Sequence, residues 1–110
     1  MPHNPQKLLL DISNACEEIM EFIGGKSIAD FKKDRILQLA LERQFEIIGE
    51  ALYRLDRIDH DNLIENIPEY SKIIGFRNVI AHGYDILDLD VLWDFAKGRV
   101  PELLEKIRNY

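Results

Sequence analysis

Apolar residues recur at intervals of three and four along nearly the whole chain of 110 residues, and this spacing constrains the fold more than any other feature. An α-helix turns about 100° per residue, so the spacing collects apolar side chains on one face. No segment shows the strict alternation that is typical of a half-buried strand. The length is that of one domain and no internal repeat is present, so residues 1–110 are expected to form a single all-α domain.

The first two helices are expected in the N-terminal half of the chain. One covers residues 5–23, and the other starts near residues 27–34 and runs to about residue 57. The second helix begins at Ser27 and Asp30, whose spacing resembles a capping box. Its apolar face is wide enough for a central helix that packs against several neighbours. Gln44 lies in the middle of that face and would need a hydrogen-bond partner if it were buried.

Two further helices are expected after a polar stretch at residues 59–66. The third covers 68–81, with a proline as its first residue. The fourth begins after Asp88, which is expected to be its N-cap. Pro101 lies inside this last helix, where a proline removes one backbone hydrogen bond and clashes with the preceding turn. A kink is therefore expected near Lys97.

Composition excludes several classes of protein. Hydrophobic residues make up 46% of the chain, too many for a disordered segment, and the longest apolar runs are far shorter than the ~20 residues that span a bilayer. The N-terminus shows no charged-then-apolar signal segment. Cys16 is the single cysteine, so no internal disulfide and no multi-cysteine metal site can form. A reducing, cytoplasmic location is expected.

The charge balance limits how this chain could bind a polyanion. Its formal net charge is −6, so it would not coat nucleic acid non-specifically. Any phosphate binding must come from a local basic cluster. Residues 32–35 and the pair Arg54 and Arg57 are the candidates outside the segment described next.

The segment at residues 73–85 is the most informative in the chain, because it places Arg77 in the centre of an apolar stripe. A guanidinium there is costly unless it is paired or faces a solvated cleft. One interpretation is an arginine that extends to solvent or pairs with the acidic face of the second helix. The other is a functional arginine in a cleft.

His82 follows Arg77 by five residues, which is about 140° around a helix. The two residues can meet at one ligand only if the helix unwinds at His82 and Gly83, or if a second protomer supplies the complement. A histidine at a helix C-terminus can also be a simple end-cap, favoured by the helix dipole. Both interpretations stay open on spacing alone.

Arginine, asparagine, histidine and tyrosine in one short stretch can form a phosphodiester site. Imidazole moves protons near neutral pH, and a guanidinium stabilises phosphate oxygens. RNA brings its own nucleophile, the 2′-OH, so such a site needs neither metal nor cofactor. Taken singly, Asn78 would be a solvated polar residue and Tyr84 a loop aromatic that closes the core.

The run RNVIAHGY at residues 77–84 resembles the Arg-x4-His-x-Tyr motif of the HepT toxins in the HEPN superfamily. Three further segments, at 45–51, 67–78 and 89–93, resemble that family's central helix, its approach to the motif and the opening of its last helix. The resemblance covers most of the chain. One departure is Tyr70, where the family pattern has tryptophan, and it bears on packing more than on chemistry.

The resemblance implies a bundle of four to five helices that forms a homodimer, with two copies of the motif across one cleft. It implies a toxin that cleaves RNA, often tRNA, as a metal-independent endoribonuclease. By similarity, Arg77 and His82 are the catalytic residues and Asn78 positions the motif. Tyr84 matches the tyrosine that an MntA-type nucleotidyltransferase antitoxin modifies with AMP, which would block RNA by size and charge.

A second hypothesis is a non-catalytic helical dimer that binds a nucleotidyltransferase and a nucleotide. The net charge of −6 is consistent with it. Dependence of toxicity on Arg77 and His82 discriminates the two, since a scaffold should tolerate both changes.

Overall fold

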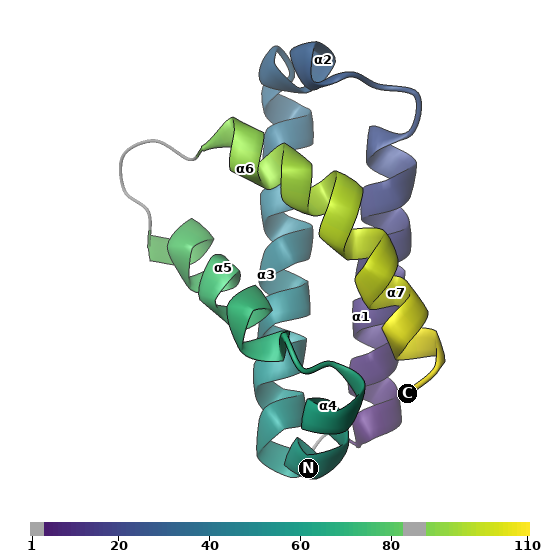
Figure 1. The fold of residues 1–110 in the computed structure, drawn as a ribbon. Helices are drawn as coiled ribbons and strands as arrows, with labels where there is room; N and C mark the ends of the chain where they lie inside the picture. Colours follow the sequence, from purple (N-terminus) through teal and green to yellow (C-terminus); the bar gives the residue numbers. More distant parts are fainter. Residues whose placement is uncertain (1–3, 83–87) are drawn as a thin grey trace.

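The computed structural model describes residues 4–82 and 88–110, with residues 77–82 as helical backbone alone. Within these residues the fold is all-helical and forms one compact unit without strands, as the periodicity predicts. Two long helices, α1 (Pro5–Ile23) and α3 (Arg35–Ile58), lie side by side through the centre of the molecule (Figure 1). The shorter helices cross one face of this pair.

The first expected helix is confirmed at both ends. The Asn4 side chain accepts a hydrogen bond from the Lys7 N–H at 2.8 Å, and Gly24 closes the helix. The apolar stripe of α1 turns inward, so that Ile12, Cys16 and Ile19 are fully buried. Burial raises the pKa of the Cys16 thiol to about 12, which makes it a packing residue and not a nucleophile.

The second expected helix is wrong as a single element, because the chain breaks at Lys33 and Asp34. A short helix, α2 (Ile28–Lys32), precedes α3. The capping box of Ser27 and Asp30 is confirmed, but it opens α2 alone. A new N-cap at Asp34 starts α3, since its carboxylate accepts a hydrogen bond from the Leu37 N–H at 3.0 Å.

Gln38 is the reason that the break is stable. Its side-chain amide lies within the core, 7% exposed, and donates to the carbonyls of Phe31 and Lys32 at 3.0 and 3.3 Å. The Phe31 carbonyl also accepts from the Asp34 N–H at 3.2 Å, whereas the Lys32 carbonyl at the end of α2 has the Gln38 amide as its donor. The polar residue expected inside the apolar face, Gln44, is instead half-buried at its edge.

No helix is expected in the polar stretch at 59–66, but the structure has one there, α4 (His60–Asn66). Leu63 and Ile67 lie four residues apart within and just after it, and both are fully buried. Two apolar side chains at helical spacing are enough to dock a short helix that is otherwise polar. Asp59, before α4, accepts hydrogen bonds from the side chains of Asn62 and Tyr110 at 2.9 Å each.

The last expected helix is a rod of three parts: α6 (Leu89–Asp94), a π-helical turn η1 (Phe95–Arg99) and α7 (Val100–Arg108). Asp88 is its N-cap as predicted, accepting from the N–H groups of Asp90 and Val91. The irregularity expected near Lys97 takes the form of the π turn, in which the Val100 N–H bonds to the Phe95 carbonyl. Pro101 has no N–H to donate, so the backbone there can widen at little cost.

Every helix contributes side chains to the core. The outer face of the α1–α3 pair stays exposed. The members of the core are Leu8, Ile12, Ala15, Cys16, Ile19, Ile23, Phe31, Leu37, Leu41, Phe45, Ile48, Ala51, Leu52, Leu55, Leu63, Ile67, Ile73, Leu92, Trp93, Ala96, Val100, Leu103, Leu104 and Ile107. Across the described residues, no helix is long and apolar enough to cross a membrane.

Candidate functional site

The motif residues belong to α5 (Tyr70–His82), which packs against α3. The helix begins two residues later than expected, because Pro68 and Glu69 form a turn after the buried Ile67. In that turn the Tyr70 N–H donates to the Ile67 carbonyl at 3.0 Å. Pro68 therefore lies in the turn between α4 and α5 and is not the first residue of α5.

Arg77, Asn78 and His82 all lie on the helical backbone of α5, which continues through His82. The expected unwinding involved His82 and Gly83, and Gly83 lies outside the described residues. In an unbroken helix the positions of Arg77 and His82 are about 140° apart, whereas Asn78 and His82 share a face. Tyr84 lies outside the described residues.

An ion pair holds the turn before α5 against α7, the last helix. The Lys106 ammonium donates to the Glu69 carboxylate at 2.5 Å, and thereby ties the turn before α5 to α7. Partial burial alone would raise the pKa of Glu69. The hydrogen bond from Lys106, with the charges of Lys106 and Arg99, instead holds that pKa below its ordinary value.

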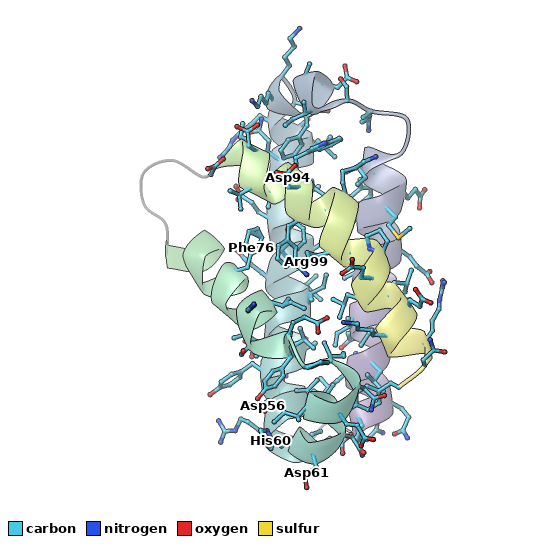
Figure 2. The ribbon with its side chains drawn as sticks, viewed as in Figure 1. Asp56, His60, Asp61, Phe76, Asp94 and Arg99 are labelled. Carbon is cyan, nitrogen blue, oxygen red and sulfur yellow. The ribbon has the colours of Figure 1, made fainter. Side chains whose placement is uncertain are left out.

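A polar cluster that the sequence did not indicate joins α3, α4 and α5. The Asp56 carboxylate lies 2.6 Å from Nδ1 of His60 and also accepts a hydrogen bond from the Tyr70 hydroxyl. The hydrogen bond with His60, and to a lesser degree the one from Tyr70, lowers the pKa of Asp56. The bond to Asp56 in turn raises the pKa of the Tyr70 phenol. Figure 2 shows Asp56 and His60 near the end of the bundle where α5 begins.

Tyr70, at which the resemblance would have tryptophan, takes part in this cluster through its hydroxyl, which donates a hydrogen bond to Asp56. The available signal in the sequence was the spacing of four residues between Asp56 and His60. That signal is weak when no helix is expected at residues 59–66, because side chains four residues apart are neighbours only on a helix.

Three phenylalanines fix the middle of α5 immediately before Arg77. Phe76 stacks on Phe95 of the π turn, with ring centroids 4.4 Å apart and planes only 2° from parallel. Phe45 of α3 meets both rings edge-on, at 5.2 and 5.5 Å. Figure 2 shows Phe76 beside the rod that contains the π turn. The position of Arg77 along the molecule is thus set through the adjacent Phe76.

The described residues contain no evident metal-binding site. No group of three or more His, Cys, Asp or Glu side chains there could hold a metal ion.

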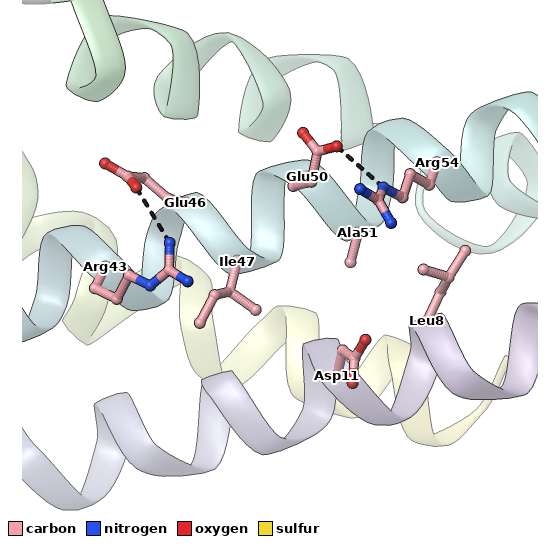
Figure 3. Close-up of a pocket in the computed structure, with 8 residues that line it drawn as sticks. All are labelled: Leu8, Asp11, Arg43, Glu46, Ile47, Glu50, Ala51 and Arg54. Carbon is pink, nitrogen blue, oxygen red and sulfur yellow. Dashed lines mark hydrogen bonds and ion pairs between the residues drawn. The ribbon is translucent and has the colours of Figure 1, made fainter. Parts of the chain in front are cut away.

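A groove of about 290 Å³ runs beside α3, and it is a poor candidate for an anion site. It lies between α1 and α3, and its cations are already paired (Figure 3). Arg43 lies 3.7 Å from Glu46, and Arg54 lies 3.0 Å from Glu50. Asp11 adds a further negative charge from α1.

The fold defines a small all-helical protein, and comparison with known protein families gives its class. The model of the family described as "Ribonuclease HepT-like" matches residues 12–110. The chain therefore belongs to the HepT-like ribonuclease family.

Curated relatives carry ribonuclease names and match along nearly their whole length. "Probable ribonuclease HepT" of Thermococcus cleftensis is 34% identical over 112 residues, covering 99% of this chain and 100% of the relative. "Putative RNase TTE0752" of Caldanaerobacter subterraneus subsp. tengcongensis is 31% identical, covering 96% and 92%. "Putative RNase MJ1380" of Methanocaldococcus jannaschii is 28% identical, covering 90% and 89%. No solved structure matches the chain.

Proposed function

We propose that this protein is a metal-independent endoribonuclease that cleaves RNA, with tRNA as the substrate class, and acts as the toxin of a toxin–antitoxin pair. The observation that carries the proposal is the placement of Arg77 and His82 on the one helix α5, in a chain of the HepT-like ribonuclease family. The ribonuclease names of relatives that match along most of their length support it.

The chemistry uses the 2′-OH of RNA as the nucleophile. Its oxygen attacks the adjacent phosphorus, the bond from phosphorus to the 5′-oxygen breaks, and a 2′,3′-cyclic phosphate and a 5′-OH result. The imidazole of His82 takes the proton from the 2′-OH, and a proton is returned to the departing 5′-oxygen. Arg77 stabilises the negative charge on the phosphate oxygens, and Asn78 positions the motif.

The site is composite and forms on a homodimer. Because α5 continues through His82, one chain presents Arg77 and His82 on different sides of a helix. A two-fold axis beside α5 would bring Arg77 of one protomer toward His82 of the other, and would form two equivalent sites in one cleft. This arrangement needs no local unwinding at His82 and Gly83.

An antitoxin of the MntA type, a nucleotidyltransferase, neutralises the enzyme by transferring AMP to Tyr84. The transfer joins the phenolic oxygen to the α-phosphate of ATP and releases pyrophosphate. It adds a bulky anionic group two residues after His82. RNA would then be excluded both by size and by charge repulsion.

The experiment that tests this function is incubation of the purified, unmodified protein with total tRNA in EDTA, beside its His82→Ala variant. We expect cleavage by the parent alone, with 2′,3′-cyclic phosphate ends. Cleavage by the variant at the parent's rate would contradict the role of His82. Mass spectrometry of the input protein excludes prior modification of Tyr84.

A non-catalytic dimer that binds a nucleotidyltransferase and a nucleotide is the second candidate. It is favoured by the net charge of −6 and by the paired state of Arg43 and Arg54 in the groove. Absence of cleavage by unmodified protein, together with a stable complex between the chain and a nucleotidyltransferase, would support it in place of the enzyme.

A further inference from the structure

One end of the bundle concentrates positive charge in a chain that is acidic as a whole. Within ten residues, 26–35, four of the 14 basic side chains stand against two acidic ones, while the whole chain carries −6. We call this surface the basic end and define it as Lys26, Lys32, Lys33 and Arg35. All four side chains are exposed, and the segment that carries them includes α2, at the top of Figure 1.

The two carboxylates of this segment are held by backbone N–H groups at helix N-termini. Asp30 accepts from the Ser27 N–H at 2.9 Å, and Asp34 accepts from the Leu37 N–H at 3.0 Å. The hydrogen bonds from the Ser27 backbone and hydroxyl lower the pKa of Asp30. The positive ends of the helix dipoles offset part of these negative charges. The α6 helix adds the exposed Asp88 and Asp90 at this end, and Asp90 is the partner of Lys32, so Lys33 and Arg35 carry positive charge that no ion pair within the described residues offsets.

Two of the four cations are uncommitted among the residues that the structure describes. Lys26 donates to the Phe22 carbonyl at 2.8 Å, and Lys32 pairs with Asp90 at 3.0 Å. Lys33 forms no ion pair there, and Arg35 reaches only the Gln38 side chain, at 3.4 Å. Lys33 and Arg35 are therefore available to an external anion.

The basic end is within reach of the motif. The ion pair between Lys32 and Asp90 joins α2 to the first turn of α6. Leu89, the first residue of α6, follows His82 by seven residues. A fully extended chain covers about 3.5 Å per residue, so the two backbones are at most about 25 Å apart. A single strand of RNA on the order of five nucleotides spans such a distance.

We propose that the basic end binds the phosphate backbone of the RNA beside the segment that is cleaved, with Lys33 and Arg35 as the main contacts. This inference rests on the proposed ribonuclease function and adds a substrate-binding surface outside the motif. Lysine and arginine supply the sequence-independent part of nucleic-acid affinity. A folded tRNA held at this distance from α5 would be bound by shape and charge and not by base sequence.

The surface suits RNA better than an acidic protein. The aromatic side chains of this end, Phe31 and Trp93, are 0% and 7% exposed and pack against each other, with centroids 5.3 Å apart and planes tilted by 34°. The core of a protein interface is enriched in aromatic anchors and depleted of lysine. Ile36, which is 81% exposed beside Arg35, is the residue that a protein partner would bury.

The test measures binding of labelled tRNA by His82→Ala protein, which holds RNA without cutting it, over a series of salt concentrations. We expect Lys33→Gln/Arg35→Gln in this background to weaken binding about tenfold and to reduce the slope of log K against log salt by about 2. Ile36→Ser should leave RNA binding unchanged. Circular dichroism verifies that each variant is folded.

The matched control is Lys7→Gln/Arg108→Gln, which removes two positive charges at the opposite end of the bundle. Both residues are exposed, and their ion pairs with Asp11 and Glu17 are surface pairs of little energetic weight. The inference is overturned if the two double variants lose affinity equally, if Ile36→Ser weakens binding as much, or if the His82→Ala protein binds no tRNA.

Failure of the inference and failure of the proposed function give different results. If the parent cleaves tRNA and Lys33→Gln/Arg35→Gln binds and cleaves as the parent does, the basic end is not a substrate surface. The proposed ribonuclease function is then still supported. If the parent does not cleave but binding depends on Lys33 and Arg35, the surface stands and the catalytic role of the motif fails.

Discussion

Gln38 shows how one polar side chain supports a break between two helices. It is buried, and its amide group satisfies the carbonyls of Phe31 and Lys32 where α2 ends. Burial of a polar group without a partner costs about 1–3 kcal/mol. The residue therefore stabilises the corner that orients the basic end.

We expect Gln38→Leu to lower the free energy of unfolding by about 1–3 kcal/mol, because the Lys32 carbonyl then loses its Gln38 donor and the Phe31 carbonyl keeps only backbone donors. Urea denaturation at neutral pH measures the loss. Gln44→Leu is the matched control: its side chain is half-buried at the edge of the apolar face and makes no hydrogen bond among the described residues, so its effect should be small. Equal losses in the two variants would contradict the role given to Gln38.

Glu69 makes part of the stability depend on pH. Its pKa is lowered from the ordinary 4.5, so the folded state favours the ionised form. The stabilisation is present above pH 4.5 and is lost as the pH falls through the lowered pKa. We expect Glu69→Gln to be less stable than the parent at pH 7, by less than about 1 kcal/mol, and the difference to vanish in acid.

Lys106→Met serves as the partner variant for this prediction, since it removes the donor of the same hydrogen bond. It should reduce the acid dependence as Glu69→Gln does, and the double variant should add little. Urea unfolding at pH 7 and at a series of values below 4.5 tests this. A parent-like pH profile in both single variants would show that the pair does not couple folding to protonation.

At the scale of the elements, the π turn η1 determines how the last helix meets α5. A π turn adds a residue to one helical turn and changes the direction of the side chains around it. Here Phe95 stacks on Phe76, the residue before Arg77. The kink expected from Pro101 thus has a consequence for the site, because it accompanies a ring contact that holds the motif helix.

We expect Phe95→Ala to lower stability by about 2 kcal/mol and tRNA cleavage by more than the folded fraction falls, because α5 loses its ring contact beside Arg77. Val91→Ala, on the same rod but 48% exposed, is the control and should change neither. Thermal unfolding and cleavage are measured on the same samples. Parent-like cleavage by folded Phe95→Ala protein would show that this contact does not position the motif.

At the scale of the whole molecule, the proposed composite site makes activity a property of two chains. Arg77 and His82 are about 140° apart on one helix, so the intact pair would be assembled between protomers. Two inactive variants should then complement each other: a heterodimer of Arg77→Ala and His82→Ala chains has one site with both residues intact.

We expect an equal mixture of these two variants, unfolded and refolded together, to regain about a quarter of the parent's tRNA cleavage. Half of randomly assorted dimers are heterodimers, and each has one intact site of two. Each variant refolded alone is the control and should stay inactive. No recovery in a mixture that native mass spectrometry shows to contain heterodimers would place both residues of a site on one chain.

The sequence alone determined the all-helical class, the ends of α1, the caps at Ser27 and Asp88 and the irregularity before Pro101, since each depends on residues within one or two turns. It also placed Arg77 on the third expected helix, but it ended that helix at residue 81, whereas α5 includes His82.

Tertiary structure decided what depends on contacts between distant residues. The break after α2 needs Gln38 to reach back to it, and α4 forms because Leu63 and Ile67 find a core to enter. The ring stack of Phe76 on Phe95 and the cluster of Asp56, His60 and Tyr70 likewise join separate helices. Local periodicity carries no information about which faces meet, because burial and side-chain pairing are set by the packing of the whole chain.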